Sequence, residues 1–524
     1  MRLFRSSRAA VGATLALLLG ACRADQPTLA APELDARLVS NKPPTSKATM
    51  ITLGDQIFED MRLSRAGNQS CASCHVDAFG FAGADESEVA NPAAALPEPF
   101  ESIGDAFYEG SLNGRFGNRK PPSAAYASFA PPLFFDKIEG TYRGGNFWDG
   151  RATGGKGITA IAAQGLKPFA SGPEHAFGPA CVLWDIWKGP YYADFLAATA
   201  VDLSKLSFSA VWTAYKNATK STANPNGVDF PQGCHNTTRL DPAFDQVIQS
   251  LPATLTTTQR NAFNAAFQKV GDALAAYEHS PLVNKFTSKF DATLFPHLAG
   301  TPGWTEEEIA GEALFFNGSG CAACHSSIDP RQLTTGVNKQ AQIFTDFSYY
   351  NLGIPRNPRN PAGLTFADIG LGQTVNLRAF DGWFKSPTVR NVDKRAPWFA
   401  GGTRKTYMHN GSLTSLEQVV HFYNTRDVRG CGTGRISETL PEADDDVWMD
   451  LPADAPADAP RHLDPEKVSK LTALGTCWPA PDFAAGLITV VIGTPNLVGD
   501  LKLSQQQEQQ LIAYMKTLSD GYVP

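Results

Sequence analysis

The sequence predicts an all-α protein with two helical domains and long irregular loops. The first observation is a motif, CxxCH, that occurs twice, beginning at Cys71 and at Cys321. The second is a helical spacing of apolar residues before each copy. The third is the abundance of 46 glycines and 37 prolines, which predicts loops over much of 100–260 and 326–400. With 524 residues, of which 43% are hydrophobic and 19% charged, the chain has room for two or three domains.

The N-terminus predicts an exported lipoprotein. Residues 1–21 contain three arginines followed by an apolar run that is too short for a comfortable membrane span. The run ends in Leu-Gly-Ala-Cys, which resembles the lipobox of bacterial lipoproteins, where the cysteine, here Cys22, is lipidated and becomes the new N-terminus. The alternative is an ordinary secretory signal with a cysteine there by chance. No later stretch of the sequence is long and apolar enough to span a bilayer.

Residues 22–49 are rich in Ala, Pro and Lys and predict a tether. By resemblance to other lipoproteins, Arg23 after the lipidated cysteine favours the periplasmic side of the outer membrane. Removal of the signal deletes three arginines and no acids, so the net charge falls from −7 to about −10. An acidic chain disfavours nucleic acid as a partner and suits a basic soluble protein.

The CxxCH motif has the spacing of a covalent haem site. Two thiols three positions apart can add to the two vinyl groups of one haem, and the adjoining imidazole then becomes the proximal ligand of the iron. A single copy would also suit a thioredoxin-like thiol pair or half of a zinc site. Two copies in an exported chain predict two covalently bound haem c groups, one per domain. The expected residues are Cys71, Cys74 and His75, and Cys321, Cys324 and His325.

Four other cysteines remain in the exported part of the chain. An even number in an oxidising compartment predicts two disulfides. The simplest of the three pairings joins Cys181 to Cys234 and Cys431 to Cys477. A metal site is the alternative, but no tight paired spacing among the four favours tetrahedral ligation.

Local patterns predict the helices that precede the two motifs. Thr305 and Glu308 form a capping box that opens a helix, and glycines end it just before the second motif. The expected inner face of this helix consists of Ile309, Ala313 and Leu314. The weaker pattern before the first motif consists of Leu53, Ile57 and Phe58. We therefore expect one haem domain at 50–295 and another at 296–524.

Eight segments of the sequence, taken in their order, indicate a family. They read LGDQIFEDMRLS, NRKPPSAAYASF, GNFWDGRA, AYEHSPLVNKF, ALFFNGSGCAACH, FTDFSYYNLGIP, FKSPTVRNV and YMHNGSLTSLEQVVHFYN. In this order they resemble the bacterial di-haem cytochrome c peroxidases and their MauG-type relatives, over nearly everything after residue 50. The resemblance implies two cytochrome c-like domains, an N-terminal haem that reacts with peroxide, a C-terminal haem that transfers electrons, and Trp148 between them. Residues 176–260 form an insert that small members lack, which could cover the peroxide pocket or bind a partner.

The resemblance also implies a peroxide pocket. Pro168 and Glu174 stand six positions apart, as do the proline and glutamate that line this pocket in the family. A carboxylate near an open iron can take a proton from one peroxide oxygen and return it to the other, which assists O–O cleavage. Glu174 is therefore the expected general acid/base. Because Ser171 and Gly172 replace the usual Asn-Pro, the neighbouring His175 is the alternative.

The first iron is expected to be open. No histidine lies between His75 and His175, and Asn91 occupies the spacing of the histidine that blocks the N-terminal iron in many family members. We therefore expect this iron to be five-coordinate when oxidised, as in MauG-type enzymes.

The second iron is expected to be closed by Tyr423. The family's axial methionine lies fourteen positions after a histidine, and counting from His409 gives Tyr423, as in MauG-type enzymes. A phenolate stabilises ferric and higher iron more than a thioether does. A capping box at Thr414 and Glu417 is expected to open the helix that carries it. The expected inner face consists of Leu416, Val419, Val420 and Tyr423. Met408 is a competing ligand, and His409 is expected near a haem propionate.

A calcium site between the haems, which the resemblance offers, is left open and is not predicted. Lys120 stands where the family's RNxPT-like motif has its asparagine ligand, so an ammonium could take the place of the ion. The stretch before His409, which supplies two backbone carbonyls in the family, is lengthened here to APWFAGGTRKTY.

These features predict a di-haem c-type peroxidase that reduces hydrogen peroxide with electrons from a soluble donor such as cytochrome c. An alternative within the class is a MauG-type oxidase that acts on a protein or organic substrate, which Tyr423 and the missing distal histidine favour. An alternative of another class is a non-catalytic electron carrier in which both irons are six-coordinate. The spin states of the oxidised irons separate the two enzymes from the carrier.

Overall fold

The described part of the protein is mainly helical, as the sequence predicts. The computed structural model describes residues 47–83, 108–238, 242–293, 296–325, 342–357, 367–394, 406–413, 415–427, 478, 481, 483 and 498–523. The predicted signal peptide, Cys22, Asn91, Cys431 and Cys477 lie outside these residues. Within them, no helix is both apolar and long enough to cross a bilayer.

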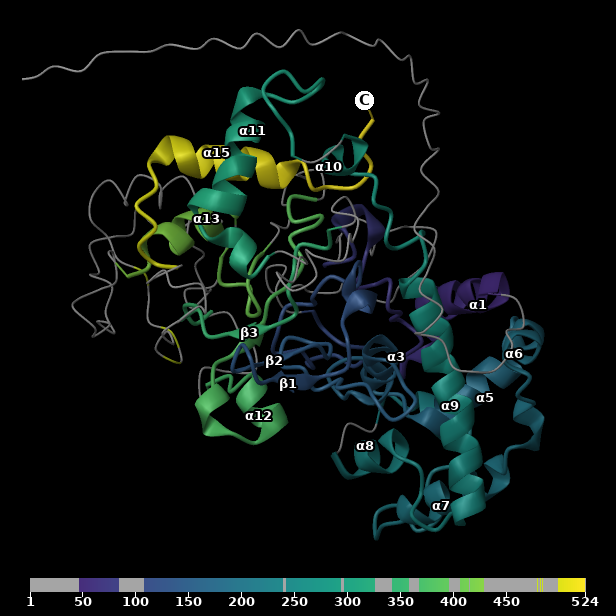
Figure 1. The fold of residues 1–524 in the computed structure, drawn as a ribbon. Helices are drawn as coiled ribbons and strands as arrows, with labels where there is room; N and C mark the ends of the chain where they lie inside the picture. The colour runs from purple at the N-terminus through teal and green to yellow at the C-terminus, as the bar shows by residue number, and fades with distance from the viewer. Residues whose placement is uncertain are drawn as a thin grey trace, which may run out of the picture. The chain divides into compact units, whose positions relative to one another are not determined.

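The described chain folds into helices and two small two-stranded sheets (Figure 1). The α-helices are α1 (Lys47–Glu59), α3 (Ala160–Gly165), α4 (Lys167–Ala170), α5 (Pro179–Lys188), α6 (Tyr192–Thr199), α7 (Phe208–Ala218), α8 (Pro242–Gln249), α9 (Thr257–Glu278), α10 (Lys289–Ala292), α11 (Glu306–Ala313), α12 (Leu371–Val375), α13 (Leu416–Thr425) and α15 (Gln505–Lys516). The strands are β1 (Phe134–Asp136), β2 (Thr141–Arg143), β3 (Tyr349–Tyr350) and β4 (Phe384–Lys385). They pair antiparallel, β1 with β2 and β3 with β4.

The first hydrophobic core is built where α1 crosses α9 (Figure 1). A Cβ at Gly54 would lie 2.0 Å from the carbonyl oxygen of Ala273, so only glycine permits this approach of the two helices. The predicted apolar residues Leu53, Ile57 and Phe58 are all buried in this core. The crossing fixes the helix that leads to the first CxxCH motif.

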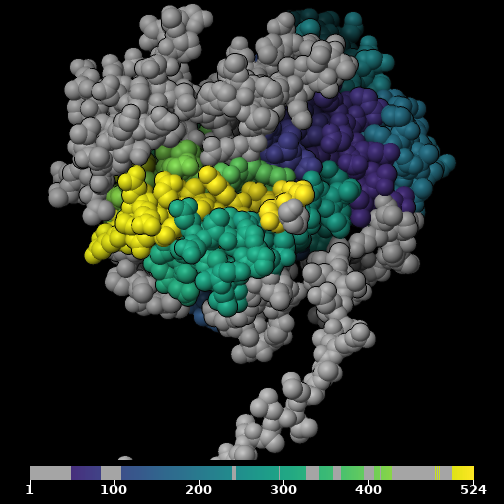
Figure 2. Space-filling model, turned by 90° about the horizontal axis from the view of Figure 1, so that it is seen from above, coloured from purple at the N-terminus to yellow at the C-terminus, as the bar shows by residue number. Residues whose placement is uncertain are grey.

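The second hydrophobic core repeats this arrangement with α11 and α15. A Cβ at Gly311 would lie 1.9 Å from the carbonyl oxygen of Gln510, so a glycine again permits the crossing. Figure 2 shows the C-terminal segment 498–523 at the surface beside the segment that contains α11. Each motif is thus preceded by a helix that packs, through a glycine, on a helix from farther along the chain.

The start of α11 is as predicted, but its buried face is not. Thr305 accepts a hydrogen bond from the backbone N–H of Glu308, and the Glu308 side chain completes the capping box. Ala313, expected on the inner face, is exposed, whereas Gly311 and Phe315 are buried. The buried face centres on Gly311 because this residue lies at the crossing with α15.

The region 160–249 is more helical than its glycine and proline content suggested. It contains α3 to α8, where the sequence predicted mostly loops. Pro179 opens α5 and Pro242 opens α8, and proline is well suited to the first position of a helix because its missing N–H would have no partner there. The disulfide between Cys181 and Cys234, which joins α5 to a later turn, confirms the predicted pairing.

The helix that carries Tyr423 begins one residue later than predicted. Ser415, not Thr414, is the N-cap of α13, and its hydroxyl accepts a hydrogen bond from the backbone N–H of Gln418. Thr414 itself lies outside the described residues. The four residues predicted for the inner face still border one common cavity, although Val419 and Tyr423 are only half-buried.

Polar contacts of buried groups join the two cores. The Tyr126 hydroxyl donates to Asp520 at 2.7 Å, across 394 positions of the sequence. Arg390 forms a two-pronged ion pair with Asp291, at 2.8 and 2.7 Å, and its guanidinium lies over the Tyr126 ring. Because a buried ion pair needs both partners, these contacts fix how the segments around the two cores meet. The domain boundary at 295/296 stays a prediction.

Candidate functional site

Both CxxCH motifs form the same tight turn. The backbone N–H of His75 donates to the carbonyl of Cys71 at 3.0 Å, and that of His325 donates to Cys321 at 2.9 Å. All four motif thiols are free and half-buried. One cavity is bordered by Cys321, Cys324 and His325, and another cavity is bordered by Cys71, Cys74 and His75. Each turn therefore presents two thiols and one imidazole to a single space.

Each motif histidine is oriented by a backbone carbonyl. The Nδ1 atom of His75 lies 2.9 Å from the Phe81 carbonyl oxygen, and that of His325 lies 3.1 Å from the Pro387 carbonyl oxygen. Burial lowers the pKa of His75, and it lowers the pKa of His325 to about 4. Both rings are therefore neutral, with Nδ1–H donating to the carbonyl and Nε2 left to bind a metal.

The N-terminal cavity, of about 100 Å³, gathers most of the predicted peroxide pocket. Its lining includes the first motif together with Trp148, Pro168, Glu174 and His175. Pro168 belongs to α4, and Glu174 and His175 follow in the turn after it. The lining includes no residue of the insert 176–260. In the described part of the chain, the insert therefore does not border this cavity.

Glu174 and His175 differ in what they can do with a proton. Burial raises the pKa of Glu174, although a hydrogen bond from Ser171 and the charge of Arg151 oppose this. Burial lowers the pKa of His175 to about 4, so the ring is neutral, and its Nδ1 lies 3.0 Å from the Leu63 carbonyl. Glu174 is the group whose pKa moves toward neutral pH, as a general acid/base requires.

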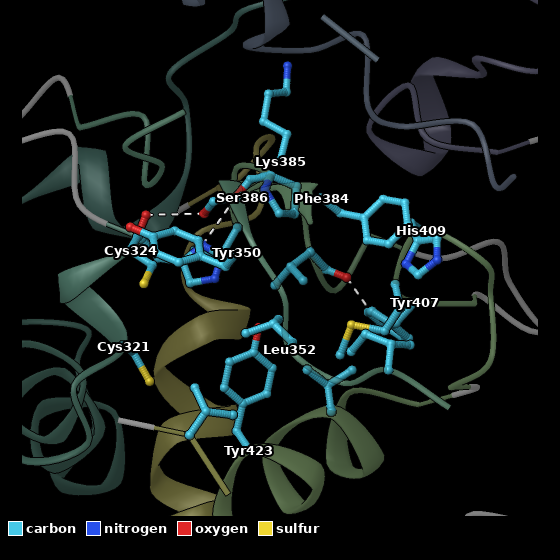
Figure 3. A pocket seen from close by; sticks show the side chains of 18 of the residues that line it. Cys321, Cys324, Tyr350, Leu352, Phe384, Lys385, Ser386, Tyr407, His409 and Tyr423 are labelled. Atoms are coloured by element: carbon cyan, nitrogen blue, oxygen red, sulfur yellow. Dashed lines mark hydrogen bonds between the residues drawn. The ribbon is translucent and has the colours of Figure 1, made fainter. Parts of the chain in front are cut away.

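The C-terminal cavity, of about 170 Å³, is lined mainly by apolar side chains. All four residues predicted for the inner face of the Tyr423 helix line it: Leu416, Val419, Val420 and Tyr423. Figure 3 shows the Tyr423 ring directed from α13 into the cavity. Burial raises the pKa of Tyr423, and the thiols of Cys324 and Cys321 add to this effect. Met408, the competing ligand, lines the same cavity.

One wall is common to the two cavities. Trp148, Lys385, Ser386, Pro387 and Thr388 border both of them. Trp148 is 9% exposed, and its indole N–H donates to the carbonyl of Lys120 at 2.7 Å. The structure thus places Trp148 between the spaces next to the two motifs.

His409 lies in the C-terminal cavity beside this wall. Its ring stacks on Phe384, with 3.5 Å between ring centroids, and lies edge-on to Trp148 at 6.5 Å (Figure 3). Burial lowers the pKa of His409 to about 3, while the charge of Asp368 opposes this shift. His409 is therefore neutral and positioned by its neighbours.

Lys120 places an ammonium at the position considered for a calcium ion, and calcium stays open. The ammonium of Lys120 lies 3.4 Å from the carbonyl oxygens of both Ala82 and Pro121, and calcium would need oxygens of this kind. The described residues contain no group of three or more His, Cys, Asp or Glu side chains placed to hold a metal. Most of the lengthened stretch before His409 lies outside the described residues.

The sequence interpretation missed three residues with a carboxyl or amine side chain in the described cavity linings, namely Glu278, Lys385 and Asp368. Glu278, at the end of α9, borders the N-terminal cavity, is 3% exposed, and its Oε2 has no hydrogen-bond partner among the described residues. Burial raises the pKa of Glu278 to about 8. Lys385 borders both cavities. Glu278 and Lys385 lie within segments that carried the family resemblance, and their place in these segments was the available signal.

The cavities fit covalently attached haem. Each combines two free thiols, a neutral imidazole held through Nδ1, and a mostly apolar lining, which are the features that hold and enclose such a group.

Comparison with known proteins agrees with this site. The family described as "Di-haem cytochrome c peroxidase" matches residues 48–296. The methylamine utilization protein MauG of Paracoccus denitrificans is 26% identical over 90% of this chain and 88% of its own length. The cytochrome c551 peroxidase of Nitrosomonas europaea is 23% identical over 78% of this chain and 81% of its own.

A solved structure shares the fold. The diheme peroxidase BthA of Burkholderia thailandensis superposes with a TM-score of 0.53 at 21% identity, over 93% of this chain and 89% of its own. The protein belongs to the di-haem cytochrome c peroxidase family, which includes MauG. It is therefore a member of a family of haem-dependent peroxidase and oxidase enzymes.

Proposed function

We propose that this protein is a di-haem c-type peroxidase that reduces hydrogen peroxide with electrons from an external donor such as a cytochrome c. Cys71 and Cys74 would attach one haem with His75 as iron ligand, and Cys321 and Cys324 the other with His325. The bound haems supply redox-active iron at which peroxide is cleaved and through which electrons pass. The overall reaction consumes one peroxide, two electrons and two protons and yields two waters.

The observation that carries this proposal is the difference between the two cavities. Acid/base groups, Glu174 and His175, line the N-terminal cavity, whereas Tyr423 and Met408, both able to ligate iron, line the C-terminal cavity. A cavity with a proton-handling carboxyl group beside a cavity with Tyr423 suits an enzyme that performs chemistry in one cavity and stores electrons in the other. An electron carrier would not need this carboxyl group.

The side chains of the N-terminal cavity would manage protons. The Glu174 carboxylate would take a proton from one peroxide oxygen and return it to the departing oxygen as water forms. Its raised pKa brings proton gain and loss closer to neutral pH. The neutral His175 ring, held through Nδ1 by Leu63, presents Nε2 as a second polar group. The backbone carbonyl of Pro168 accepts a hydrogen bond from the backbone N–H of His175 at 3.2 Å, which closes the turn.

The wall between the cavities would pass electrons. Trp148 borders both spaces and is held at its indole N–H and its backbone carbonyl. A single aromatic side chain in contact with two redox centres shortens the distance that an electron must cross. His409, in edge-on contact with Trp148, would position this ring and interact with the haem of the C-terminal cavity.

A MauG-type oxidase that acts on a protein or organic substrate is the second candidate. The position of Tyr423 in the C-terminal cavity supports it, because a phenolate ligand favours oxidised iron. The match to MauG over 90% of the chain supports it as well. The two candidates share the site and differ in what the oxidising equivalents are used for.

We further propose that the chain is exported, lipidated at Cys22 and anchored on the periplasmic side of the outer membrane. The disulfide between Cys181 and Cys234 supports an oxidising compartment. Mass spectrometry of the N-terminal peptide would test lipidation. Cys22→Ser should release the protein from the membrane fraction, and retention of that variant would contradict the proposal.

Electron paramagnetic resonance of the oxidised protein tests the function. We expect one high-spin ferric signal, from an open iron at His75, and one low-spin signal, from an iron between His325 and Tyr423. Two low-spin signals would overturn both enzyme candidates in favour of an electron carrier. Peroxide turnover with a soluble cytochrome c and with an artificial donor then separates the peroxidase from the oxidase, since only the former should sustain turnover with the cytochrome.

A further inference from the structure

Among the described residues that line either cavity, Lys385 is the only lysine or arginine. It lies at the end of β4, in the wall that the cavities share. A haem would bring two propionate carboxylates into a mostly apolar space, so the position of a cation at this wall matters.

Among the described residues, the hydrogen-bond partners of the Lys385 ammonium are neutral. It donates to the carbonyl oxygen of Gly145 at 2.9 Å and to Oδ1 of Asn146 at 2.8 Å. The acid that acts on it, Asp149, is itself paired with Arg119 at 2.6 Å and Arg151 at 3.1 Å. Burial lowers the pKa of Lys385 to about 7 against the opposing effect of Asp149. A nearby anion would restore the charged form, because an ammonium among neutral acceptors is unfavourable in the protein interior.

The direction of the side chain indicates which cavity this anion occupies. Figure 3 shows Lys385 extending away from Tyr423 and Cys321, so the ammonium leaves the C-terminal cavity that its backbone borders. Its acceptor Asn146 lines the N-terminal cavity and not the C-terminal one. The positive charge therefore lies on the N-terminal side of the shared wall.

We propose that Lys385 binds the propionate carboxylates of the haem in the N-terminal cavity and thereby raises the reduction potential of that haem. The inference rests on the proposed function only in assuming haem at both motifs. A positive charge near an iron disfavours the more positive ferric state, so its presence raises the midpoint potential and its removal lowers it.

The same residue also holds the segment that carries Trp148. The backbone N–H of Lys385 donates to the Trp148 carbonyl at 2.8 Å, while its ammonium holds Gly145 and Asn146, three and two positions earlier. Lys385 is thus a positioning residue for Trp148 as well as a partner for the haem. The two roles separate experimentally, because the backbone contact survives any side-chain substitution.

The test is a redox titration of each iron, followed by electron paramagnetic resonance, in the purified holoprotein without peroxide. Lys385→Gln keeps a donor for Gly145 and removes the charge, and it should lower the midpoint potential of the N-terminal haem more than that of the C-terminal haem. Lys385→Arg keeps the charge and should leave both potentials near their original values. Lys137→Gln, an exposed lysine that lines neither cavity, is the matched control and should change neither potential.

Unchanged potentials in Lys385→Gln would overturn the proposal, as would equal shifts in the Gln and Arg variants or a shift confined to the C-terminal haem. If Lys385→Gln loses haem or does not fold, Lys385→Met supplies the same measurement. Because the titration needs no peroxide, a protein without peroxidase activity can still satisfy it. If both irons prove low-spin, the signal that changes in Tyr423→Met belongs to the C-terminal haem, and the other signal belongs to the N-terminal haem. The potential of the N-terminal haem can then still be measured, so failure of the proposed function and failure of this inference remain distinct.

Discussion

The backbone carbonyl of Trp148 accepts a hydrogen bond from the backbone N–H of Lys385 at 2.8 Å, and both residues border both cavities. The indole N–H of Trp148 is fixed separately by Lys120. A tryptophan held at two points in the wall between two redox sites is suited to carry electrons between them.

Trp148→Phe should slow the passage of electrons from the C-terminal haem to the N-terminal cavity. The variant keeps an aromatic ring but loses the more readily oxidised indole. It also leaves the Lys120 carbonyl without this donor, which should lower the free energy of unfolding by about 1–3 kcal/mol. Stopped-flow spectroscopy would follow the reoxidation of the reduced C-terminal haem after addition of peroxide. Trp383→Phe, outside the lining of both cavities, is the control, and equal rates in the two variants would exclude a relay through Trp148.

Glu174→Gln should slow peroxide cleavage by about 100-fold, because this is the usual contribution of a general acid/base. Haem content should not change, because the proposed haem attachment uses Cys71, Cys74 and His75 and does not involve Glu174. The carboxylate is the form that accepts the first proton, so the rate should rise with pH through the pKa of Glu174. Burial raises that pKa, so the rise should lie above the usual range of glutamate and vanish in the Gln variant.

Rapid mixing with peroxide across a pH series checks this prediction. A rate and pH profile equal to those of the unmodified protein would transfer the proton role to the alternative group, and His175→Gln would then be the variant expected to lose activity.

The sequence predicted the residues of the site better than it predicted their surroundings. Cysteine spacing predicts both motifs, and the family resemblance predicts Tyr423, because each of these predictions depends on a short stretch of the sequence. The role of Lys385 instead depends on its hydrogen bond to Gly145, 240 positions away, and no local sequence pattern predicts that hydrogen bond. The helices between 160 and 249 were missed for a related reason, since Pro179 reads as a loop residue until its place at the start of α5 is seen.

Tyr423→Met should raise the reduction potential of the C-terminal haem and convert its low-spin signal to another form. A thioether favours ferrous iron, whereas a phenolate favours ferric iron. Met408→Leu is the matched control, because Met408 lines the same cavity and is the competing ligand. If Tyr423 is the ligand, the spectrum changes in the first variant and persists in the second. An unchanged spectrum in Tyr423→Met would leave Tyr423 as a packing residue, and a change in Met408→Leu alone would assign the iron to Met408.

Glu278→Gln should make the protein more stable above neutral pH. Burial raises the pKa of Glu278 to about 8, from 4.5 for an ordinary glutamate. Between these values the native state holds a proton that the unfolded state has lost, so the free energy of unfolding falls as the pH rises. The loss is about 1.4 kcal/mol per pH unit in this window, on the order of several kcal/mol in total. Glutamine has no proton to lose and escapes this penalty.

Denaturant unfolding of the holoprotein at a series of pH values measures the effect. The difference in free energy of unfolding between the variant and the unmodified protein should grow in favour of the variant from about pH 4.5 to about pH 8 and then level off. Glu139→Gln, which removes a half-buried carboxyl group that lines neither cavity, is the control. If the difference in free energy of unfolding between Glu278→Gln and the unmodified protein does not change with pH, the carboxyl group is ionised in the native protein, with a cationic partner in the N-terminal cavity.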